Sequence, residues 1–351
     1  MPGSDARIRL ADYFVGVVNG VIYTSIKNKA LRLQNEENLS PIKAWEHDST
    51  SITAYLSDRL IADSSRETLQ LVSLPGYEMI SELKELFYLM VPIFYVGRQC
   101  VFIYRREHSV LAQVYFALWD IDKLEPVWEN KAPKATVFYS VSDEYVYVLA
   151  GFFGEFSKYE LSTGRLVWTK TFKDWELDIY QPNPKYRVEA HGDLFIFQGR
   201  ALINLNPSRL VAVSCDTGQV EWIVEDVLGR EFAVSQEGVV YSMKGSRLNQ
   251  LDATTGKLLS THTIDEPISE TLSLQLTRTH VWVTYAHNGC HLIAINPETG
   301  KVEKKYSVEN FISGAPVICN NRLYVCTLNL DIENQDRKDF VIEGEGGYIP
   351  D

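Results

Sequence analysis

Short apolar segments separated by polar turns recur along the whole chain. Within many segments apolar and polar positions alternate with a period of two, as in residues 68–72 (TLQLV) and 272–276 (LSLQL). A period of two is typical of β-strands, whereas the 3.6-residue period of an amphipathic helix is nearly absent. Residues 81–89 (SELKELFYL) are compatible with a turn or two of helix or with a loop followed by a strand. The pattern predicts an all-β protein.

A small polar turn followed by an alternating strand is the first marker of an internal repeat. Such turns between alternating apolar runs are typical of β-hairpins. Eight copies occur along the chain, at residues 19–23, 57–61, 97–102, 142–147, 191–196, 237–241, 278–282 and 320–324.

A Thr-Gly turn followed by a strand with a tryptophan is the second marker, and it runs in phase with the first. It is clearest in the sequences LSTGRLVW (161–168) and SCDTGQVEW (214–222). Further and more degenerate copies lie at residues 41–45, 75–80, 126–128, 254–259 and 298–302. The tryptophan position recurs about every 43 residues, within the range of propeller or solenoid repeats, at residues 45, 80, 128, 168, 222, 260 and 304.

Each repeat contains four short strands, the content of one β-propeller blade. Because there are eight polar turns but seven Thr-Gly turns, the last repeat lacks its fourth strand. Residues 6–11 (ARIRLA) are predicted to supply that strand and close the ring, since closure protects sheet edges. The prediction is one eight-bladed propeller over residues 1–351; the alternative is seven blades with differently folded C-terminal strands. The predicted blades are residues 13–46, 51–81, 91–129, 135–169, 187–223, 232–261, 272–305 and 312–351.

The repeat resembles that of propellers with pyrroloquinoline-quinone-like repeats, whose blades carry a pattern close to ALD-x-x-TG-K-x-x-W. Residues 251–257 (LDATTGK) and 293–301 (IAINPETGK) match it closely, and the resemblance is good over residues 140–310 and weak before 130. It implies that the glycine adopts a turn conformation and that the tryptophan fills the gap between neighbouring blades. Glycine tolerates positive φ, and tryptophan buries a large surface.

The resemblance also implies an enzyme hypothesis, that of a quinone-dependent alcohol dehydrogenase. Those enzymes are exported and place an adjacent Cys-Cys disulfide against the cofactor. Here the five cysteines are widely spaced, without a CxxC motif, which indicates buried free thiols. The resemblance is therefore to a non-enzymatic, cofactor-free branch, and no cofactor or metal is expected. Residues 287–291 and 331–336 are rich in metal-ligating side chains, but their spacing does not match a known site.

The charge of the chain narrows the class of partner. It has 34 Lys+Arg and 46 Asp+Glu, a formal net charge of −12. This balance argues against a nucleic-acid binder and favours a basic protein partner. No apolar stretch suits a membrane span, and residues 1–14 lack an apolar signal-peptide region, so a cytoplasmic location is expected. Removal of a signal peptide would instead imply a periplasmic or secreted protein. The oligomeric state stays open.

The expected binding surface is the face that carries the longer loops, at residues 105–108, 150–156, 171–186, 199–208, 286–290 and 329–339. Aromatic residues in these loops are candidate interface anchors, although they could equally pin residues 172–186 onto their own blade. The candidate partner-binding residues are Arg105, Arg106, His108, Phe152, Phe153, Trp175, Asp178, Tyr180 and Tyr186.

Two classes of function follow. The favoured hypothesis is a non-enzymatic scaffold that binds a basic protein through this face, in one version a cytoplasmic immunity protein that inhibits a toxin. The alternative is a quinone-dependent dehydrogenase-like or sugar-binding enzyme.

Overall fold

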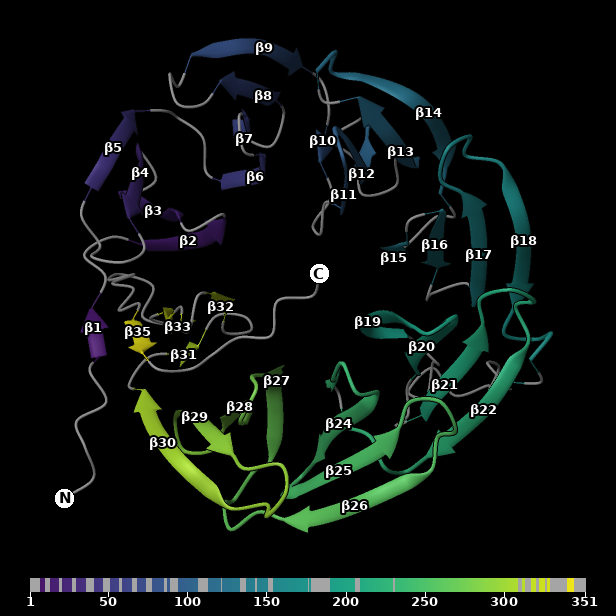
Figure 1. Ribbon diagram of the computed structural model, residues 1–351, viewed down its shortest axis with the longest axis vertical. Coiled ribbons are helices and arrows are strands. Elements are labelled where there is room, and N and C mark those ends of the chain that lie inside the picture. The colour runs from purple at the N-terminus through teal and green to yellow at the C-terminus, as the bar shows by residue number, and fades with distance from the viewer. Residues whose placement is uncertain are drawn as a thin grey trace.

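The computed structural model contains only β-strands as regular elements in the part of the chain that it describes (Figure 1). None of the described residues forms a helix that is long and apolar enough to cross a membrane. The described residues are 7–9, 13–18, 21–26, 30–35, 41–46, 51–56, 59–64, 68–73, 78–84, 87–88, 94–106, 113–120, 122–132, 137–142, 144–150, 154–175, 177, 190–205, 209–229, 231–308, 311–312, 317–319, 322–325, 327–328 and 340–343.

The first four sheets in chain order are antiparallel and are built from consecutive strands. The first contains β2 (Tyr13–Val18), β3 (Val21–Ile26), β4 (Ala30–Asn35) and β5 (Pro41–Glu46). The second contains β6 (Ser51–Leu56), β7 (Arg59–Ser64), β8 (Thr68–Ser73) and β9 (Met79–Lys84). The third contains β10 (Phe87–Tyr88), β11 (Phe94–Val96), β12 (Gln99–Arg105), β13 (Val114–Asp120) and β14 (Glu125–Lys131). The fourth contains β15 (Val137–Val141), β16 (Tyr145–Ala150), β17 (Glu155–Glu160) and β18 (Leu166–Thr171).

The next three sheets repeat this plan. The fifth contains β19 (Ala190–Phe197), β20 (Arg200–Leu205), β21 (Arg209–Ser214) and β22 (Val220–Glu225). The sixth contains β23 (Phe232–Val234), β24 (Val239–Lys244), β25 (Arg247–Asp252) and β26 (Leu258–Thr263). The seventh contains β27 (Glu270–Leu276), β28 (Val281–Ala286), β29 (Cys290–Ile295) and β30 (Val302–Val308).

The last sheet combines the two ends of the chain. It contains β32 (Val317–Cys319), β33 (Arg322–Val325), β35 (Phe340–Glu343) and β1 (Arg7–Arg9), beside a small ladder of β31 (Phe311–Ile312) with β34 (Thr327–Leu328). Strand β1 pairs antiparallel with β35, with Arg7 opposite Ile342 and Arg9 opposite Phe340. Because the last repeat lacks its own fourth strand, the sequence predicts this pairing for residues 6–11.

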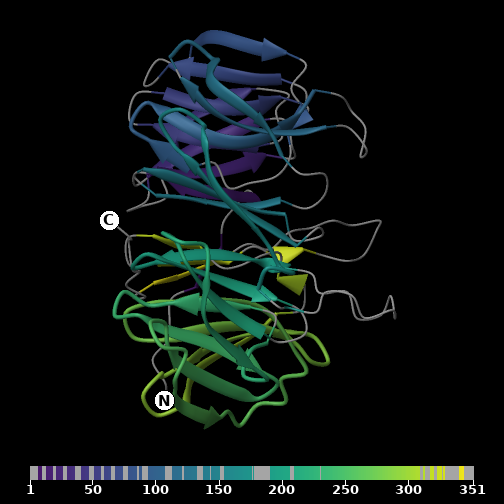
Figure 2. The same ribbon diagram turned by 90° about the vertical axis from the view of Figure 1, so that its right-hand side faces the viewer.

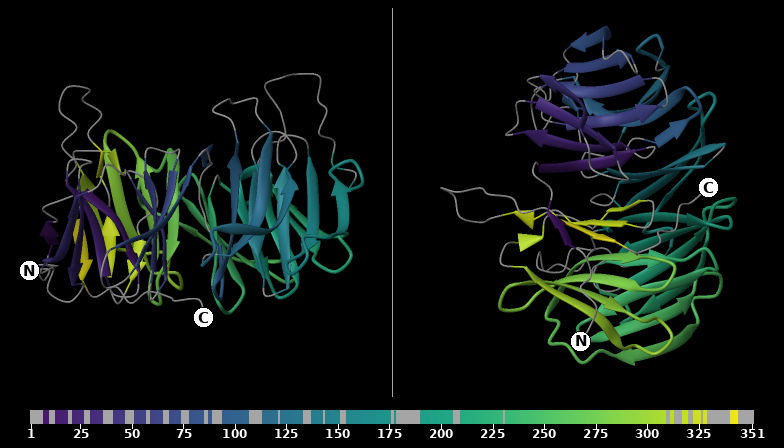
Figure 3. Two further views of the ribbon diagram at one scale, coloured as in Figure 1. Left: turned by 90° about the horizontal axis from the view of Figure 1, so that it is seen from above. Right: turned by 60° about the vertical axis from the view of Figure 1, so that its left-hand side comes forward.

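The sheets follow one another around a ring, with the first strand of each towards the centre and the fourth at the perimeter (Figure 1). Views from the side show strands that run along the axis of the ring rather than across it (Figure 2, Figure 3). The all-β prediction and the four-stranded antiparallel repeat are confirmed. The helical alternative for residues 81–89 is wrong, because this segment contains the end of β9 and all of β10.

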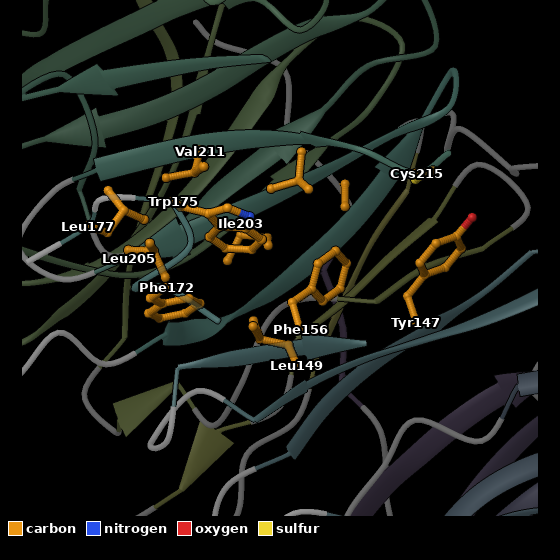
Figure 4. Close-up of a cluster of buried hydrophobic side chains, with 12 residues drawn as sticks. Tyr147, Leu149, Phe156, Phe172, Trp175, Leu177, Ile203, Leu205, Val211 and Cys215 are labelled. Carbon is orange, nitrogen blue, oxygen red and sulfur yellow. The ribbon is translucent and has the colours of Figure 1, made fainter. Parts of the chain in front are cut away.

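The core lies between neighbouring sheets. The sequence of strand β20 is almost continuously apolar because both faces of the strand are covered. Ala201, Ile203 and Leu205 pack towards the fourth sheet, whereas Leu202 packs towards the sixth. Alternate side chains of a strand point to opposite faces, so a middle strand with both faces covered needs apolar residues at every position. Figure 4 shows the cluster between the fourth and fifth sheets, where Phe156 and Phe172 approach Ile203 and Leu205.

The Thr-Gly turns and tryptophans join adjacent sheets, as the repeat predicts. Gly164, Gly218 and Gly256 have φ of +69°, +69° and +71°. A Cβ on each would meet the ring of the tryptophan one sheet earlier, namely Trp128, Trp168 and Trp222 respectively. The indole N–H groups of Trp128 and Trp222 also donate to the turn of the next sheet, at Leu161 O (2.7 Å) and Thr254 O (2.9 Å). The tryptophan therefore fills the space that the missing glycine side chain leaves.

The covering residue of the sixth repeat differs from the sequence prediction. The tryptophan position of the sixth repeat, Ser260, does not cover the next turn; His262, two residues later, packs on Gly300 instead.

The polar turn predicted at residues 191–193 is also wrong, because these residues lie inside β19, where the register shifts between Ala190 and Leu194. The turn lies at Gln198 and Gly199, which have φ of +44° and +76°. A two-residue hairpin turn whose twist matches that of its strands requires positive φ at both residues. Residues 200–205, expected within a long loop, are β20.

Candidate functional site

Antiparallel strand order separates the turns onto two faces of the ring. The turns between the first and second and between the third and fourth strands of each sheet form one face, here called the short-turn face. The turns between the second and third strands and the connections between sheets form the other, here called the long-loop face. Of the nine candidate partner-binding residues, His108, Phe152, Phe153, Asp178, Tyr180 and Tyr186 lie outside the described residues, and Arg105 is described only as the last residue of β12.

Arg106 lies on the long-loop face with an exposed side chain. Its Nη2 is 2.6 Å from Oε2 of Glu129, and its guanidinium lies 5.3 Å from the ring centroid of Tyr115. The hydroxyl of Tyr104 also donates to Glu129, and burial raises the pKa of the Glu129 carboxyl. The strands behind Arg106 therefore orient a planar cation at the surface, where guanidinium groups recognise carboxylates and aromatic rings.

Trp175 is buried, with 6% of its surface exposed. Its Nε1–H donates to Gly218 O at 2.9 Å, and its ring stacks on Phe172 with centroids 5.3 Å apart. The candidate interface anchor thus belongs to the core between the fourth and fifth sheets (Figure 4). For Trp175, the interpretation that aromatic residues pin the loop onto the propeller is the one that holds. Trp175 fixes the loop both to its own sheet and, through Gly218, to the next sheet.

The connection between the fifth and sixth sheets is held from below by buried polar side chains. Asn204 and Asn249 donate to Gly229 O (3.5 Å) and Val227 O (2.6 Å), and Ser242 accepts from Gly229 N at 3.0 Å. Lys244 donates to the backbone oxygen of Asp226 at 2.8 Å. A Cβ on Gly229 would collide with the backbone of the sixth sheet. The strands beneath this part of the long-loop face therefore hold its backbone through several hydrogen bonds.

The next connection, between the sixth and seventh sheets, is held through Glu266. Tyr285 Oη and Lys305 Nζ donate to Oε2 of Glu266 at 2.7 and 2.6 Å. Burial alone would raise the pKa of the Glu266 carboxyl, but the hydrogen bonds from Lys305 and Tyr285 together lower it. Burial, together with the Glu266 carboxylate, raises the pKa of Tyr285. Ser246 Oγ donates to the backbone oxygen of Glu266, so side chain and backbone are both fixed.

The segment 287–291 forms a tight hairpin turn, in which the N–H of His287 donates to the backbone oxygen of Gly289 at 2.9 Å. His291 stacks on Tyr285, and its Nε2 lies 2.8 Å from the backbone oxygen of His287. Cys290 is buried. Within the described part of the chain, no three His, Cys, Asp or Glu side chains are grouped so that they could hold a metal ion.

A pocket near the centre of the ring was missed by the sequence reasoning. It has a volume of about 580 Å³ and lies beside the first strands of the fifth, sixth and seventh sheets, next to their short-turn ends. We call it the inner-strand pocket; its lining residues are 194–197, 231–236 and 273–276. Phe195, in the apolar run Leu194–Phe197, is 39% exposed there. The aromatic residue Phe195 was a sign of this pocket in the sequence. Three strands that are far apart in the sequence come together only in the folded ring.

One stretch of the chain matches the model of a known family. Residues 206–339 match the family described as "Outer membrane protein assembly factor BamB". Over these residues the repeats are similar to pyrroloquinoline-quinone-like propeller repeats. The match covers the later sheets of the propeller, where the Thr-Gly turns are also best preserved. No curated protein matches the chain significantly.

Solved structures of several propellers resemble the whole chain. BamB from Moraxella catarrhalis has a TM-score of 0.67 at 14% identity, over 96% of this chain and 98% of that one. Sqt1 from Saccharomyces cerevisiae has a TM-score of 0.62 at 11% identity, over 97% and 96%. The quinohemoprotein alcohol dehydrogenase from Comamonas testosteroni has a TM-score of 0.61 at 11% identity, over 99% and 77%. At these identities the likeness concerns the fold.

Proposed function

We propose that the chain is a non-enzymatic scaffold that binds a protein partner through the long-loop face of a single eight-bladed propeller. The observation that carries the proposal is the construction of that face: side chains of the strands beneath hold two successive connections through hydrogen bonds. A surface ordered before binding loses little conformational entropy when a partner arrives. The similarity of residues 206–339 to a family named for an assembly factor supports the same class of function.

The eight-bladed ring closed by the N-terminal strand is part of this proposal. It is supported by the pairing of β1 with β35 and by the packing of β2 beside β32, which brings the first and last sheets together. Deletion of residues 1–11 would leave β35 with an unpaired edge, so we expect a lower unfolding midpoint and self-association in sedimentation experiments. An unchanged midpoint with a monomeric deletion variant would contradict closure by β1.

A basic partner fits the formal net charge of −12. A cytoplasmic immunity protein that covers a basic toxin is one specific version of the proposal. Complementary charges accelerate association, and the acceleration weakens with salt. We therefore expect an association rate that falls steeply between low and physiological ionic strength.

The experiment compares the two faces with matched arginine variants. Arg106→Ala alters the long-loop face, where Arg106 is 59% exposed, whereas Arg165→Ala removes an arginine from the short-turn face, where it is 74% exposed. The wild-type protein and the variants are used to recover partners from native cells, and the recovered partner is then purified for affinity measurements. The proposal predicts one stoichiometric partner whose affinity falls about tenfold or more for Arg106→Ala, a hot-spot effect, and is unchanged for Arg165→Ala. Affinity lost only with Arg165→Ala would contradict the proposed face.

An enzyme is the second candidate, favoured by the likeness to the quinohemoprotein dehydrogenase. The residues described here do not fit the quinone site that the resemblance implies. Cys100, Cys215 and Cys290 are separate buried thiols, not an adjacent pair. The described residues also provide no cluster of metal ligands. Purified protein incubated with the quinone and Ca²⁺ tests this candidate: dye reduction by an added alcohol would establish an enzyme.

A further inference from the structure

We propose that the inner-strand pocket is a second binding site, distinct from the long-loop face, and that it takes an extended peptide through one aromatic or large aliphatic side chain flanked by neutral or basic residues. The pocket lies beside the short-turn halves of β19 and β27 and along the whole of the three-residue strand β23, whereas the function proposed above uses the loops of the long-loop face. The inference does not depend on that function.

The walls of the pocket are apolar and firmly held. Nine of its fourteen lining residues are apolar. Phe232, Val234 and Leu274 are almost completely buried in the cores on either side. The ring of Phe197 packs on Gly238 of the sixth sheet. Phe195 is the exposed aromatic side chain of the wall. A volume of about 580 Å³ falls within the roughly 300–1,000 Å³ of typical ligand sites and accommodates a large side chain.

The backbone of the walls favours a peptide over an apolar small molecule. Strands β19, β23 and β27 each stand at the end of their sheet in the strand order. One edge of each strand therefore lies outside the hydrogen-bond ladder of its sheet. An extended peptide can pair its own N–H and C=O groups with such an edge while an alternate side chain enters a pocket, which is the logic of strand addition. Ser235, Gln236 and Gln275 add polar groups to the same lining.

The charge of the pocket lining favours peptides with neutral or basic flanking residues over acidic peptides. Glu231 is the one ionisable residue among the fourteen, and the lining contains no lysine or arginine. An acidic peptide would place its carboxylate beside Glu231 within a protein of net charge −12. Neutral or basic flanking residues avoid that repulsion.

Three short peptides test the proposal: acetyl-GGFGK-amide, acetyl-GGAGK-amide and acetyl-GGFGE-amide. Each is titrated into methyl-labelled protein while the Leu, Ile and Val methyl resonances are followed by NMR. The Phe-Lys peptide is expected to shift the methyls of Leu194, Ile196 and Leu276 and to bind about tenfold more tightly than the Ala-Lys peptide, as burial of a benzyl group predicts. The Phe-Glu peptide is expected to bind more weakly than the Phe-Lys peptide.

Variants of two exposed apolar residues provide the control. Phe195→Ala is expected to weaken binding of the Phe-Lys peptide several-fold. Leu259→Ala, on the outer strand β26 where Leu259 is 51% exposed, is expected to leave binding unchanged. Gln275→Arg adds a cation to the pocket and is expected to remove the preference for lysine over glutamate. Equal affinity for the Phe and Ala peptides, or shifts centred on Leu258 and Leu259, would overturn the proposal.

Discussion

The Thr-Gly hairpins of the sixth and seventh sheets have the same backbone geometry but different side-chain chemistry. In the sixth, Oδ1 of Asp252 accepts from the N–H groups of Thr254 (3.0 Å) and Thr255 (2.7 Å). In the seventh, Oδ1 of Asn296 accepts from the two corresponding N–H groups at 3.0 and 3.1 Å. The glycine N–H then donates back across each turn, at 2.8 Å in the sixth and 2.9 Å in the seventh.

The residue that covers each hairpin differs as well. Trp222 of the fifth sheet covers Gly256, whereas His262 of the sixth sheet covers Gly300. The two glycines nevertheless have nearly the same φ, +71° and +68°. The turn therefore depends on a left-handed glycine and an oxygen acceptor, whereas the covering side chain can be exchanged.

The largest effect is expected from the glycines. Gly256→Ala would place a methyl group 2.7 Å from the ring of Trp222, and Gly300→Ala would place one against the Cβ of His262, which rotation of the side chain cannot move. Steric overlap adds to the cost of positive φ in alanine, so we expect a loss of about 3 kcal/mol or more in the free energy of unfolding for each. Urea denaturation measures it.

Gly97→Ala is the matched control for these variants. Gly97 has φ +61°, but a Cβ there meets no described atom within 4 Å. Only the backbone cost remains, so the expected loss is about 1 kcal/mol. If all three variants lost the same amount, the covering side chain would contribute nothing to the requirement for glycine.

The covering residues themselves should rank next. Trp222→Ala removes a partly buried indole from the cluster between the fifth and sixth sheets and is expected to cost about 3 kcal/mol. His262→Ala removes a smaller ring and is expected to cost about 1 kcal/mol, close to an average substitution. Unfolding midpoints of the two variants against wild type measure the difference. Equal losses would mean that the histidine seals its interface as well as the tryptophan does.

These local components explain how much of the fold the sequence could predict. Strand periodicity and the glycine of each Thr-Gly turn are local, so they were visible as repeats and are confirmed by the positive φ of Gly164, Gly218 and Gly256. His262 was not visible, because its role comes from packing across two sheets and not from its place in the repeat. The turn at Gln198 was missed since glutamine is not a usual residue at positive φ and a more typical Gly-Asp pair lies nearby.

The candidate site was less predictable than the fold. An aromatic residue in a loop looks the same in sequence whether it faces a partner or the core, and only the structure shows that Trp175 donates to Gly218 and is buried. Arg106 lies on the long-loop face because it follows the end of β12, and strand order determines which turns share a face. The inner-strand pocket combines residues up to 82 positions apart, from Leu194 to Leu276, and no local pattern encodes that arrangement.

A smaller effect should separate two tryptophans that look alike in the sequence. Trp222→Phe keeps most of the ring but loses the hydrogen bond to Thr254 O, so we expect a cost of about 1 kcal/mol. The buried Nε1 of Trp168 has no acceptor among the described residues. Trp168→Phe removes that unpaired donor, and we expect a change of less than about 0.5 kcal/mol. Parallel urea titrations compare them; a Trp168→Phe loss equal to that of Trp222→Phe would mean that ring shape, and not the hydrogen bond, sets the cost.

The smallest effect concerns the oxygen acceptor and appears only in acid. The hydroxyl of Thr255, and then its backbone N–H, donate to Asp252 and lower the pKa of that carboxyl below its ordinary 3.8. A carboxyl whose pKa falls on folding stabilises the protein above its unfolded pKa, and that contribution is lost as the pH falls through the folded value. Asp252→Asn keeps the acceptor oxygen, as Asn296 does, but does not titrate. We therefore expect a slightly lower unfolding midpoint than wild type at pH 7 and a smaller difference, or none, at pH 3. Asp252→Ala, which has no acceptor, should remain destabilised at both values; if Asp252→Asn and Asp252→Ala behaved alike, the oxygen shared by the two hairpins would not be what stabilises them.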